Sequence, residues 1–143
     1  GWHRNYLETL YRQNLLVKAG AIVVDETPID LRKIETPAYI QAGREDHIAP
    51  AESVWRLMDH LSGPKRFVLA GSGHIAGVVN PPAAGKYQYW RNDADPKSLD
   101  EFVAGATEHK GSWWPDWSAW LAEFGGKQVA AKGWCSAYAK KAA

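Results

Sequence analysis

Apolar residues recur along the chain in helix-like and strand-like stretches. In residues 5–20, apolar side chains fall mostly three or four positions apart and a Lys-Ala-Gly sequence closes the stretch, which predicts an amphipathic helix. Residues 21–24 are short and β-branched, which predicts a peripheral strand or hairpin arm. Two apolar runs of strand length, residues 38–43 and 66–70, flank residues 52–61, whose apolar side chains have helical period. This order predicts a βαβ unit with two parallel strands joined by a right-handed crossover.

The second half of the chain is interrupted by turn-forming residues. Pro, Gly, Asn and Asp punctuate residues 80–111, so we expect a loop-rich stretch with one short helix over residues 98–106. A last helix is predicted from about residue 115 to residue 124, with an apolar face that helical spacing favours for the core. That face consists of Trp117, Trp120, Leu121 and Phe124. From residue 125 the chain is rich in Ala, Gly and Lys, which predicts a mobile tail over residues 125–143.

Length and composition narrow the class of protein. A chain of 143 residues that is 45% hydrophobic is long enough for one domain with a real core. A formal net charge of +1 excludes a nucleic-acid binder that works by a basic stripe. One cysteine excludes a disulfide framework, and no apolar run approaches the length of a membrane span. We therefore expect a protein of a reducing compartment, without nucleic-acid partners or a transmembrane segment.

Two residues that follow the predicted strands carry the clearest chemical signal. Asp46 lies in the loop after residues 38–43, and His74 lies in the loop after residues 66–70. Parallel strands bring their carboxyl ends to one edge of a sheet, so we expect the Asp46 carboxylate and the His74 ring within hydrogen-bond reach. A carboxylate on Nδ1–H holds a histidine base in one tautomer and leaves Nε2 to accept a proton from a nucleophile. The spacing is also compatible with Asp46 only beginning a turn before Pro50 and with His74 having no chemical task.

The glycines around His74 do not form a dinucleotide-binding motif. Residues 71–77 read GSGHIAG, where the third glycine comes one position late, and the Pro-Pro pair at residues 81–82 leaves no room for the phosphate-binding helix. We expect instead that these glycines permit positive-φ turns that aim His74 into a site.

Other candidate groups give weaker signals. Cys135 has no preceding strand and no nucleophile elbow, so we do not assign it as a nucleophile. No histidine or cysteine pair has metal-ligand spacing, and we expect neither a metal nor a cofactor. His47, beside Asp46, is compatible with a loop-orienting or substrate-contacting role and with a solvated side chain. Trp113 and Trp114 precede the last helix and are the freer aromatic residues for contact with an apolar surface or partner.

Three longer motifs add a resemblance. REDHIAP occupies residues 44–50, GSGHIAGVVNPP occupies residues 71–82, and GSWWPDW occupies residues 111–117. In this order they resemble the C-terminal part of polyhydroxyalkanoate synthases, most of all the short-chain, class I kind. The resemblance covers most of the stretch from about residue 5 to residue 121, and no motif covers the tail after residue 124.

The resemblance implies a fold and a set of site residues. The fold class is α/β, the C-terminal portion of an α/β-hydrolase fold built on the parallel βαβ unit with flanking helices and incomplete on its own. Residues 1–124 would form this part of the catalytic domain. Asp46 would match the aspartate of a Cys-Asp-His triad and His74 its histidine. His47, Ile75 and Ala76 would lie beside the site or line the substrate pocket.

The resemblance also implies an activity and partners. The family polymerises (R)-3-hydroxyacyl-CoA into storage polyester and releases CoA, so the expected partners are this substrate, the polyester, the surface of cytoplasmic granules and a second copy in a homodimer. The chain opens on Gly1, its single methionine is Met58, and the family's cysteine would precede both loops. We therefore expect a fragment that is inactive alone. Two alternatives are a fragment of a serine-dependent esterase or depolymerase, and a non-catalytic polymer-binding module that uses the tryptophans.

Overall fold

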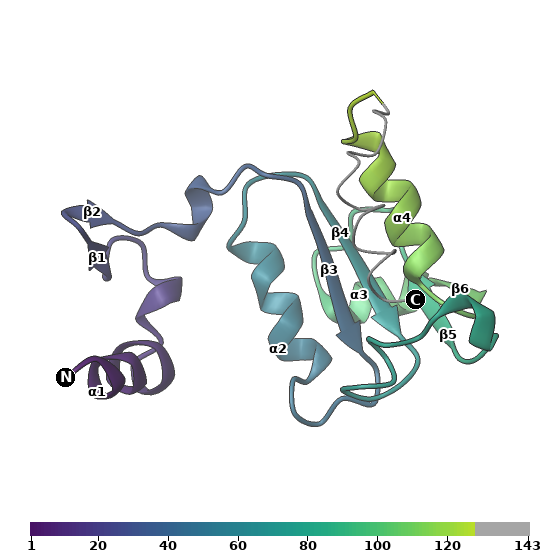
Figure 1. Cartoon of the computed structure of the whole chain (residues 1–143), viewed down its shortest axis with the longest axis horizontal. Coiled ribbons are helices and arrows are strands. Elements are labelled where there is room, and N and C mark those ends of the chain that lie inside the picture. Colours follow the sequence, from purple (N-terminus) through teal and green to yellow (C-terminus); the bar gives the residue numbers. More distant parts are fainter. Residues whose placement is uncertain (128–143) are drawn as a thin grey trace, which may run out of the picture.

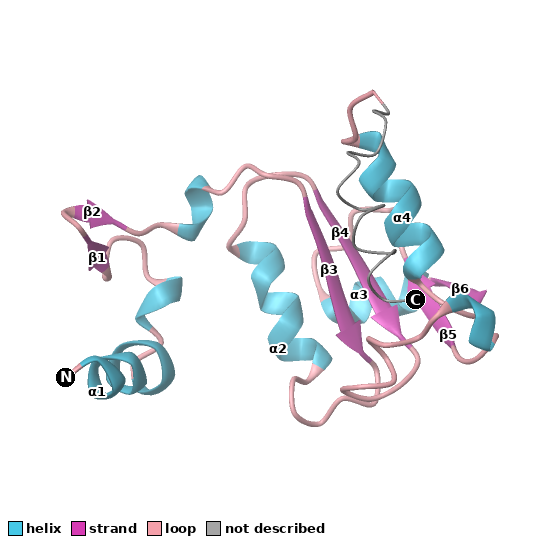
Figure 2. Ribbon diagram, viewed as in Figure 1, coloured by secondary structure: helices cyan, strands magenta, loops and turns pink. Residues whose placement is uncertain are grey.

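The computed structural model describes residues 1–127 and contains one main sheet of four strands. The sheet has the order β3-β4-β5-β6. Its strands are β3 (Ala38–Gly43), β4 (Lys65–Ala70), β5 (Gln88–Arg91) and β6 (Thr107–Lys110). Strands β3 and β4 are parallel, whereas β5 is antiparallel to both β4 and β6 (Figures 1 and 2). Residues 128–143, which include Cys135 and most of the expected tail, lie outside the described residues.

The predicted βαβ unit is confirmed. Between β3 and β4 the chain forms α2 (Ala51–Trp55), which continues as the 3₁₀ turn η4 (Arg56–Asp59). Ala38 is paired with Lys65 and Gly43 with Ala70, so the two strands begin and end in register. Their carboxyl ends therefore meet at one edge of the sheet, where Figure 2 shows the two following loops side by side.

The core lies on one face of this unit. Alternate residues of β3 and β4, among them Ile40 and Phe67, are buried against Trp55 of α2 and Phe102 of α3 (Leu99–Gly105). The ring centroids of Phe67 lie 4.8 Å from Trp55 and 5.0 Å from Phe102, in edge-to-face arrangements. Such pairs each add about 1 kcal/mol beyond the area they bury. The expected helix over residues 98–106 is thus confirmed as α3, and Ser98 caps it by accepting a hydrogen bond from the Glu101 amide.

The other face of the unit is covered by α4 (Trp114–Glu123). Tyr39, which points away from the core because it alternates with Ile40, contacts Trp120 edge-to-face at 5.4 Å. The expected apolar face of this helix is buried only at Trp120. The expectation for the other three positions is wrong: Trp117, Leu121 and Phe124 are 39%, 43% and 51% exposed. Helical spacing predicts the face, but the side of α4 that contacts Tyr39 of β3 carries Asp116 and Trp120.

The expectation of a loop-rich stretch over residues 80–111 is wrong in two places, because strands β5 and β6 form an antiparallel pair there. In β5 only Tyr89 is buried, and every residue of β6 is polar, with His109 alone partly buried. Strand β6 carries little apolar signal, because its residues are polar and it pairs through its backbone with β5. The sheet is consequently mixed rather than purely parallel.

The N-terminal segment differs from the single helix expected over residues 5–20. It consists of α1 (Trp2–Tyr6), the π-helical turn η1 (Leu7–Arg12) and the 3₁₀ turn η2 (Leu15–Val17), interrupted where Asn14 adopts a left-handed conformation with φ of 47°. Most of its apolar residues stay exposed, because α1 stands apart from the sheet (Figure 1), whereas Leu10 and Leu15 are partly buried. The short arm is confirmed as a hairpin, in which β1 (Val23–Val24) pairs with β2 (Thr27–Pro28).

Two short 3₁₀ turns complete the described chain: η3 (Leu31–Lys33) precedes β3, and η5 (Pro82–Ala84) precedes β5. Within residues 1–127, β3 pairs with a strand on one side only. The other side of β3 therefore presents backbone N–H and C=O groups that no described strand pairs. The division of the chain at residue 124 stays a prediction.

Candidate active site

Asp46 and His74 lie together at the carboxyl edge of the parallel strands. Asp46 follows β3 and His74 follows β4, and His74 Nδ1 lies 2.9 Å from Asp46 Oδ2. The predicted hydrogen-bond contact between Asp46 and His74 is therefore confirmed. The Asp46 side chain is almost buried, at 7% exposure, whereas the His74 side chain is 48% exposed. The ring is thus held on its inner side by the carboxylate and is accessible on its outer side.

Asp46 also organises its own loop. Its Oδ1 accepts hydrogen bonds from the backbone amides of Ile48 and Ala49, both at 2.9 Å. The Ala49 amide, followed by the His74 ring and the Ile48 amide, lowers the pKa of Asp46 below its ordinary 3.8, and partial burial opposes the shift. Both interpretations of Asp46 thus hold geometrically, because it begins a turn and also contacts the histidine.

This arrangement selects one form of the histidine. An ionised carboxylate only accepts hydrogen bonds, so His74 Nδ1 donates to Asp46 Oδ2. In the neutral ring Nε2 then carries a lone pair. The pair is therefore prepared to accept a proton at Nε2 from a thiol or hydroxyl group, and Asp46 would stabilise the resulting imidazolium.

The glycines near His74 serve close backbone approach rather than positive-φ turns, which corrects the expectation above. Gly71, Gly73 and Gly77 do not have positive φ angles. A Cβ on Gly77 would lie 2.7 Å from the Gly73 carbonyl oxygen, and one on Gly43 would lie 2.7 Å from that of Ser72. The Gly77 amide donates to the Gly73 carbonyl at 2.8 Å and closes a single helical turn around His74. Glycine at position 43 therefore allows the loops that follow β3 and β4 to approach each other closely.

Trp113 and Trp114 are less free than expected. The Trp113 indole Nε1 donates to the Gly77 carbonyl at 2.8 Å, and the Trp114 Nε1 donates to the Val78 carbonyl at 3.0 Å. Both rings are partly buried. The sequence could not reveal this, because indole direction does not follow from spacing along the chain.

The structure gives the exposure of the three residues expected beside the site. His47 is exposed, Ile75 is 74% exposed and Ala76 is partly buried. A cavity of about 240 Å³ lies instead under Lys65 and Arg66, at the opposite end of β4 from His74. The assignment of His47, Ile75 and Ala76 to the surroundings of the site or to a substrate pocket stays a prediction.

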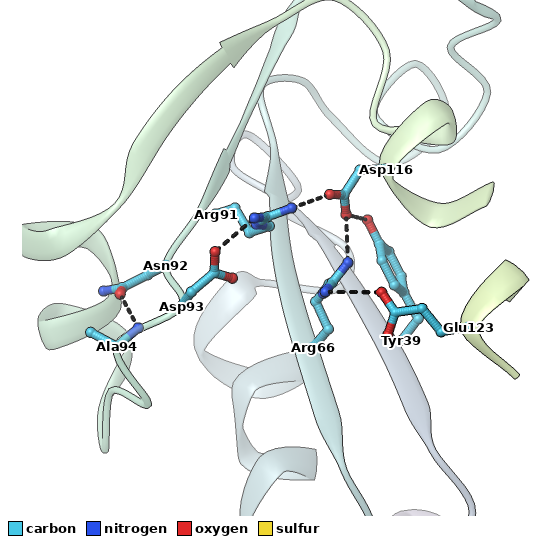
Figure 3. Close-up of polar contacts among 8 residues, drawn as sticks. All are labelled: Tyr39, Arg66, Arg91, Asn92, Asp93, Ala94, Asp116 and Glu123. Carbon is cyan, nitrogen blue, oxygen red and sulfur yellow. Dashed lines mark hydrogen bonds and ion pairs between the residues drawn. The ribbon is translucent and has the colours of Figure 1, made fainter. Parts of the chain in front are cut away.

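An ion-pair network that the sequence did not indicate anchors α4 to the sheet (Figure 3). Asp116, whose side chain is 7% exposed, accepts hydrogen bonds from Arg91 of β5 and from the Tyr39 hydroxyl, the latter at 2.8 Å. Arg66 of β4 lies 3.7 Å from the same carboxylate. Burial, and then the bond to Asp116, raise the pKa of Tyr39. The sequence did not indicate the ion pairs of Asp116, because side-chain direction does not follow from spacing along the chain.

The part of the chain that the structure describes contains no group of three or more His, Cys, Asp or Glu side chains that could hold a metal ion. None of the helices in residues 1–127 is long and apolar enough to cross a membrane.

The lowered pKa of Asp46 makes a testable prediction. The Ile48 and Ala49 amide resonances should titrate with a midpoint below 3.8, because both amides donate to this carboxylate. Since the folded-state pKa is depressed, the stability that Asp46 contributes is present above its unfolded pKa and is lost as pH falls through the folded pKa. NMR titration of the folded chain, with the urea-unfolded chain as reference, measures both midpoints. Equal midpoints would contradict the prediction.

The fold and this pair define an α/β protein with a histidine–carboxylate pair at the ends of parallel strands. In sequence, 130 residues, or 91% of the chain, are 49% identical to the poly(3-hydroxyalkanoate) polymerase subunit PhaC of Cupriavidus necator and 43% identical to that of Rhizobium meliloti. A poly(3-hydroxyalkanoate) polymerase of Methylorubrum extorquens is 44% identical over 131 residues. These segments cover 22%, 21% and 22% of the respective relatives.

The chain is therefore homologous to part of the poly(3-hydroxyalkanoate) polymerases, which confirms the resemblance to polyhydroxyalkanoate synthases. It spans about a fifth of the length of the curated relatives it matches.

A profile for high potential iron-sulfur proteins also matches residues 82–142. Iron–sulfur clusters are held by several cysteine thiolates. The whole sequence contains one cysteine, so these residues do not supply the ligands of such a cluster.

Proposed function

We propose that Asp46 and His74 are the acid and the base of a Cys-Asp-His triad in a polyhydroxyalkanoate synthase with an α/β-hydrolase fold. The observation that carries the proposal is the 2.9 Å contact between the two side chains at the carboxyl ends of adjacent parallel strands. In α/β-hydrolases the acid and the histidine follow the nucleophile in this chain order. The cysteine nucleophile would come from a part of the polymerase outside these 143 residues, since the chain covers about a fifth of its relatives.

His74 would activate the cysteine in the first step. A free thiol has a pKa of about 8.5 and is mostly protonated at neutral pH. Nε2 accepts the thiol proton, the thiolate attacks the thioester carbonyl of (R)-3-hydroxyacyl-CoA, and the carbon–sulfur bond to CoA breaks. The CoA thiolate takes the proton back from the imidazolium, and the acyl group remains on the cysteine. Asp46 holds the ring and stabilises its charge while the proton is there.

The second step transfers an acyl group to a 3-hydroxyl group, which needs a general base. The geometry favours His74 for this role over Asp46. Both oxygens of Asp46 already accept hydrogen bonds, and its lowered pKa makes it a weak base. His74 Nε2 carries no such partner among the described residues.

Further parts of the proposal concern the surroundings of the pair. Ala76, two residues after His74, borders the acyl group, and His47 and Ile75 lie beside the site. The substrate is (R)-3-hydroxyacyl-CoA and the product is polyester, at cytoplasmic granules, with the complete enzyme acting as a homodimer. The similarity to proteins named poly(3-hydroxyalkanoate) polymerases supports this over the esterase and polymer-binding alternatives.

A chimera tests the proposed function. This chain would replace the matching residues of the Cupriavidus necator polymerase subunit, to which it is 49% identical. We expect the chimera to release CoA from 3-hydroxybutyryl-CoA and to form polymer, and the chain alone to release none, because it lacks the nucleophile. A chimera that folds but instead hydrolyses polyester without chain growth would favour the esterase alternative. CoA release by the chain alone, abolished in His74→Gln, would contradict the proposed division of the triad.

A further inference from the structure

The loop that carries His74 receives hydrogen bonds from two consecutive tryptophans. The acceptors are the carbonyls of Gly77 and Val78, three and four residues after His74 and at the end of the helical turn that surrounds it. Two donors on adjacent carbonyls restrict both the position and the direction of this peptide segment. The contacts that precede His74 are different: the Gly71 amide donates to Gln88 of β5, and the Ser72 carbonyl accepts from Glu45.

Trp113 and the start of α4 contact the sheet directly. The Trp113 ring stacks on Tyr39 of β3 with centroids 5.9 Å apart, and the hydroxyl of the same tyrosine donates to Asp116 in the first turn of α4. Arg91 of β5 donates to the other oxygen of Asp116. The start of α4 is thus bound to β3 and β5. The two indole N–H groups in turn bind the His74 loop to this end of the helix.

The histidine ring needs such support. Its side chain is about half exposed, and its hydrogen bond within residues 1–127 is the one to Asp46. The ring therefore stays in line with the carboxylate only as long as the backbone of its loop stays in place. Asp46 is fixed separately, by the amides of its own loop. The His74 side of the contact is the less constrained side.

We propose that Trp113 and Trp114 are positioning residues for the His74–Asp46 pair, whose two indole N–H groups hold the His74 loop so that Nδ1 faces the carboxylate. The catalytic consequence rests on the proposed function. The hydrogen bonding of His74 does not, so it can be measured on this chain whether or not the polymerase assignment holds.

The experiment compares Trp113→Phe and Trp114→Phe, which keep an aromatic ring but remove the N–H donor. The matched control is Trp117→Phe in α4, since the Trp117 indole donates no hydrogen bond within residues 1–127 and the residue is 39% exposed. In the whole ¹⁵N-labelled chain, the ring nitrogen shifts give the ratio of the Nδ1–H to the Nε2–H tautomer of His74 at a pH where the ring is neutral. The signals are assigned by their loss in His74→Gln.

We expect each of the two variants to lower this ratio about fivefold, the change that corresponds to one typical hydrogen bond. The control should leave it unchanged. An unchanged ratio in both variants, or an equal change in Trp117→Phe, would overturn the proposal. Amide shifts of β3 and β4 report folding, and if Trp113→Phe unfolds the chain, Trp114→Phe decides, because the Trp114 bond lies at the surface.

Discussion

Replacement of Asp46 by Asn should lower kcat of the chimeric polymerase by about 10⁴-fold, the loss expected when a triad histidine is held in the wrong tautomer. The structure shows why. The amides of Ile48 and Ala49 require an acceptor at one side-chain atom, so the Asn carbonyl oxygen would stay with them. The Asn NH₂ group would then face His74 Nδ1 and donate to it. The ring proton would move to Nε2, where the nucleophile must be deprotonated.

Glu45→Gln is the matched control, because Glu45 is an exposed carboxylate in the same loop. It removes the same formal charge at the neighbouring position and should leave kcat within about twofold, as expected of a surface change away from these contacts. CoA release from 3-hydroxybutyryl-CoA measures both variants at equal folded concentration. If Asp46→Asn keeps more than a tenth of the activity, His74 does not depend on Asp46 for its tautomer.

The Asp116→Asn substitution should destabilise the chain by about 3 kcal/mol. Removing one partner of a buried ion pair costs about 3 to 5 kcal/mol, and the lower end applies here because Arg91 and Arg66 are 27% and 24% exposed. The carboxylate accepts from Tyr39 and Arg91 and also lies near Arg66, so its loss leaves two guanidinium groups facing a neutral amide. Urea unfolding followed by circular dichroism measures the free energy of unfolding.

Asp93→Asn provides the comparison for the network. Asp93 also contacts Arg91, at 2.6 Å, but its side chain is 64% exposed. Exposed ion pairs contribute about 0 to 1 kcal/mol, so this variant should change the free energy of unfolding by less than about 1 kcal/mol. Equal losses in the free energy of unfolding for Asp116→Asn and Asp93→Asn would contradict the prediction that the buried carboxylate contributes more stability than the exposed one.

Part of the fold could be predicted because apolar runs mark buried strands. Strands β3 and β4 and helix α2 follow directly from such runs, and their parallel pairing brings Asp46 and His74 together. Strand β6 could not be predicted in this way, because all four of its residues are polar and backbone pairing to β5 holds them.

The candidate site was predictable only where chain order determines position. Loops after adjacent parallel strands must meet, so the contact between Asp46 and His74 follows from topology. The indole bonds from Trp113 and the buried pairing of Asp116 depend on side-chain direction and on strand β5, which the sequence pattern did not reveal. The same holds for the glycines, whose role depends on how closely the two loops approach.

The two tasks of Asp46 restrict which acid can occupy its position. In chemical terms a glutamate can orient a catalytic histidine as well as an aspartate can. Here, however, one oxygen accepts from amides two and three residues ahead, a local contact that the short aspartate side chain makes and that an extra methylene would displace. The loop geometry, rather than the proton chemistry, thus selects aspartate. Among homologous sequences, an exchange to glutamate at this position would be accompanied by a loop of different length.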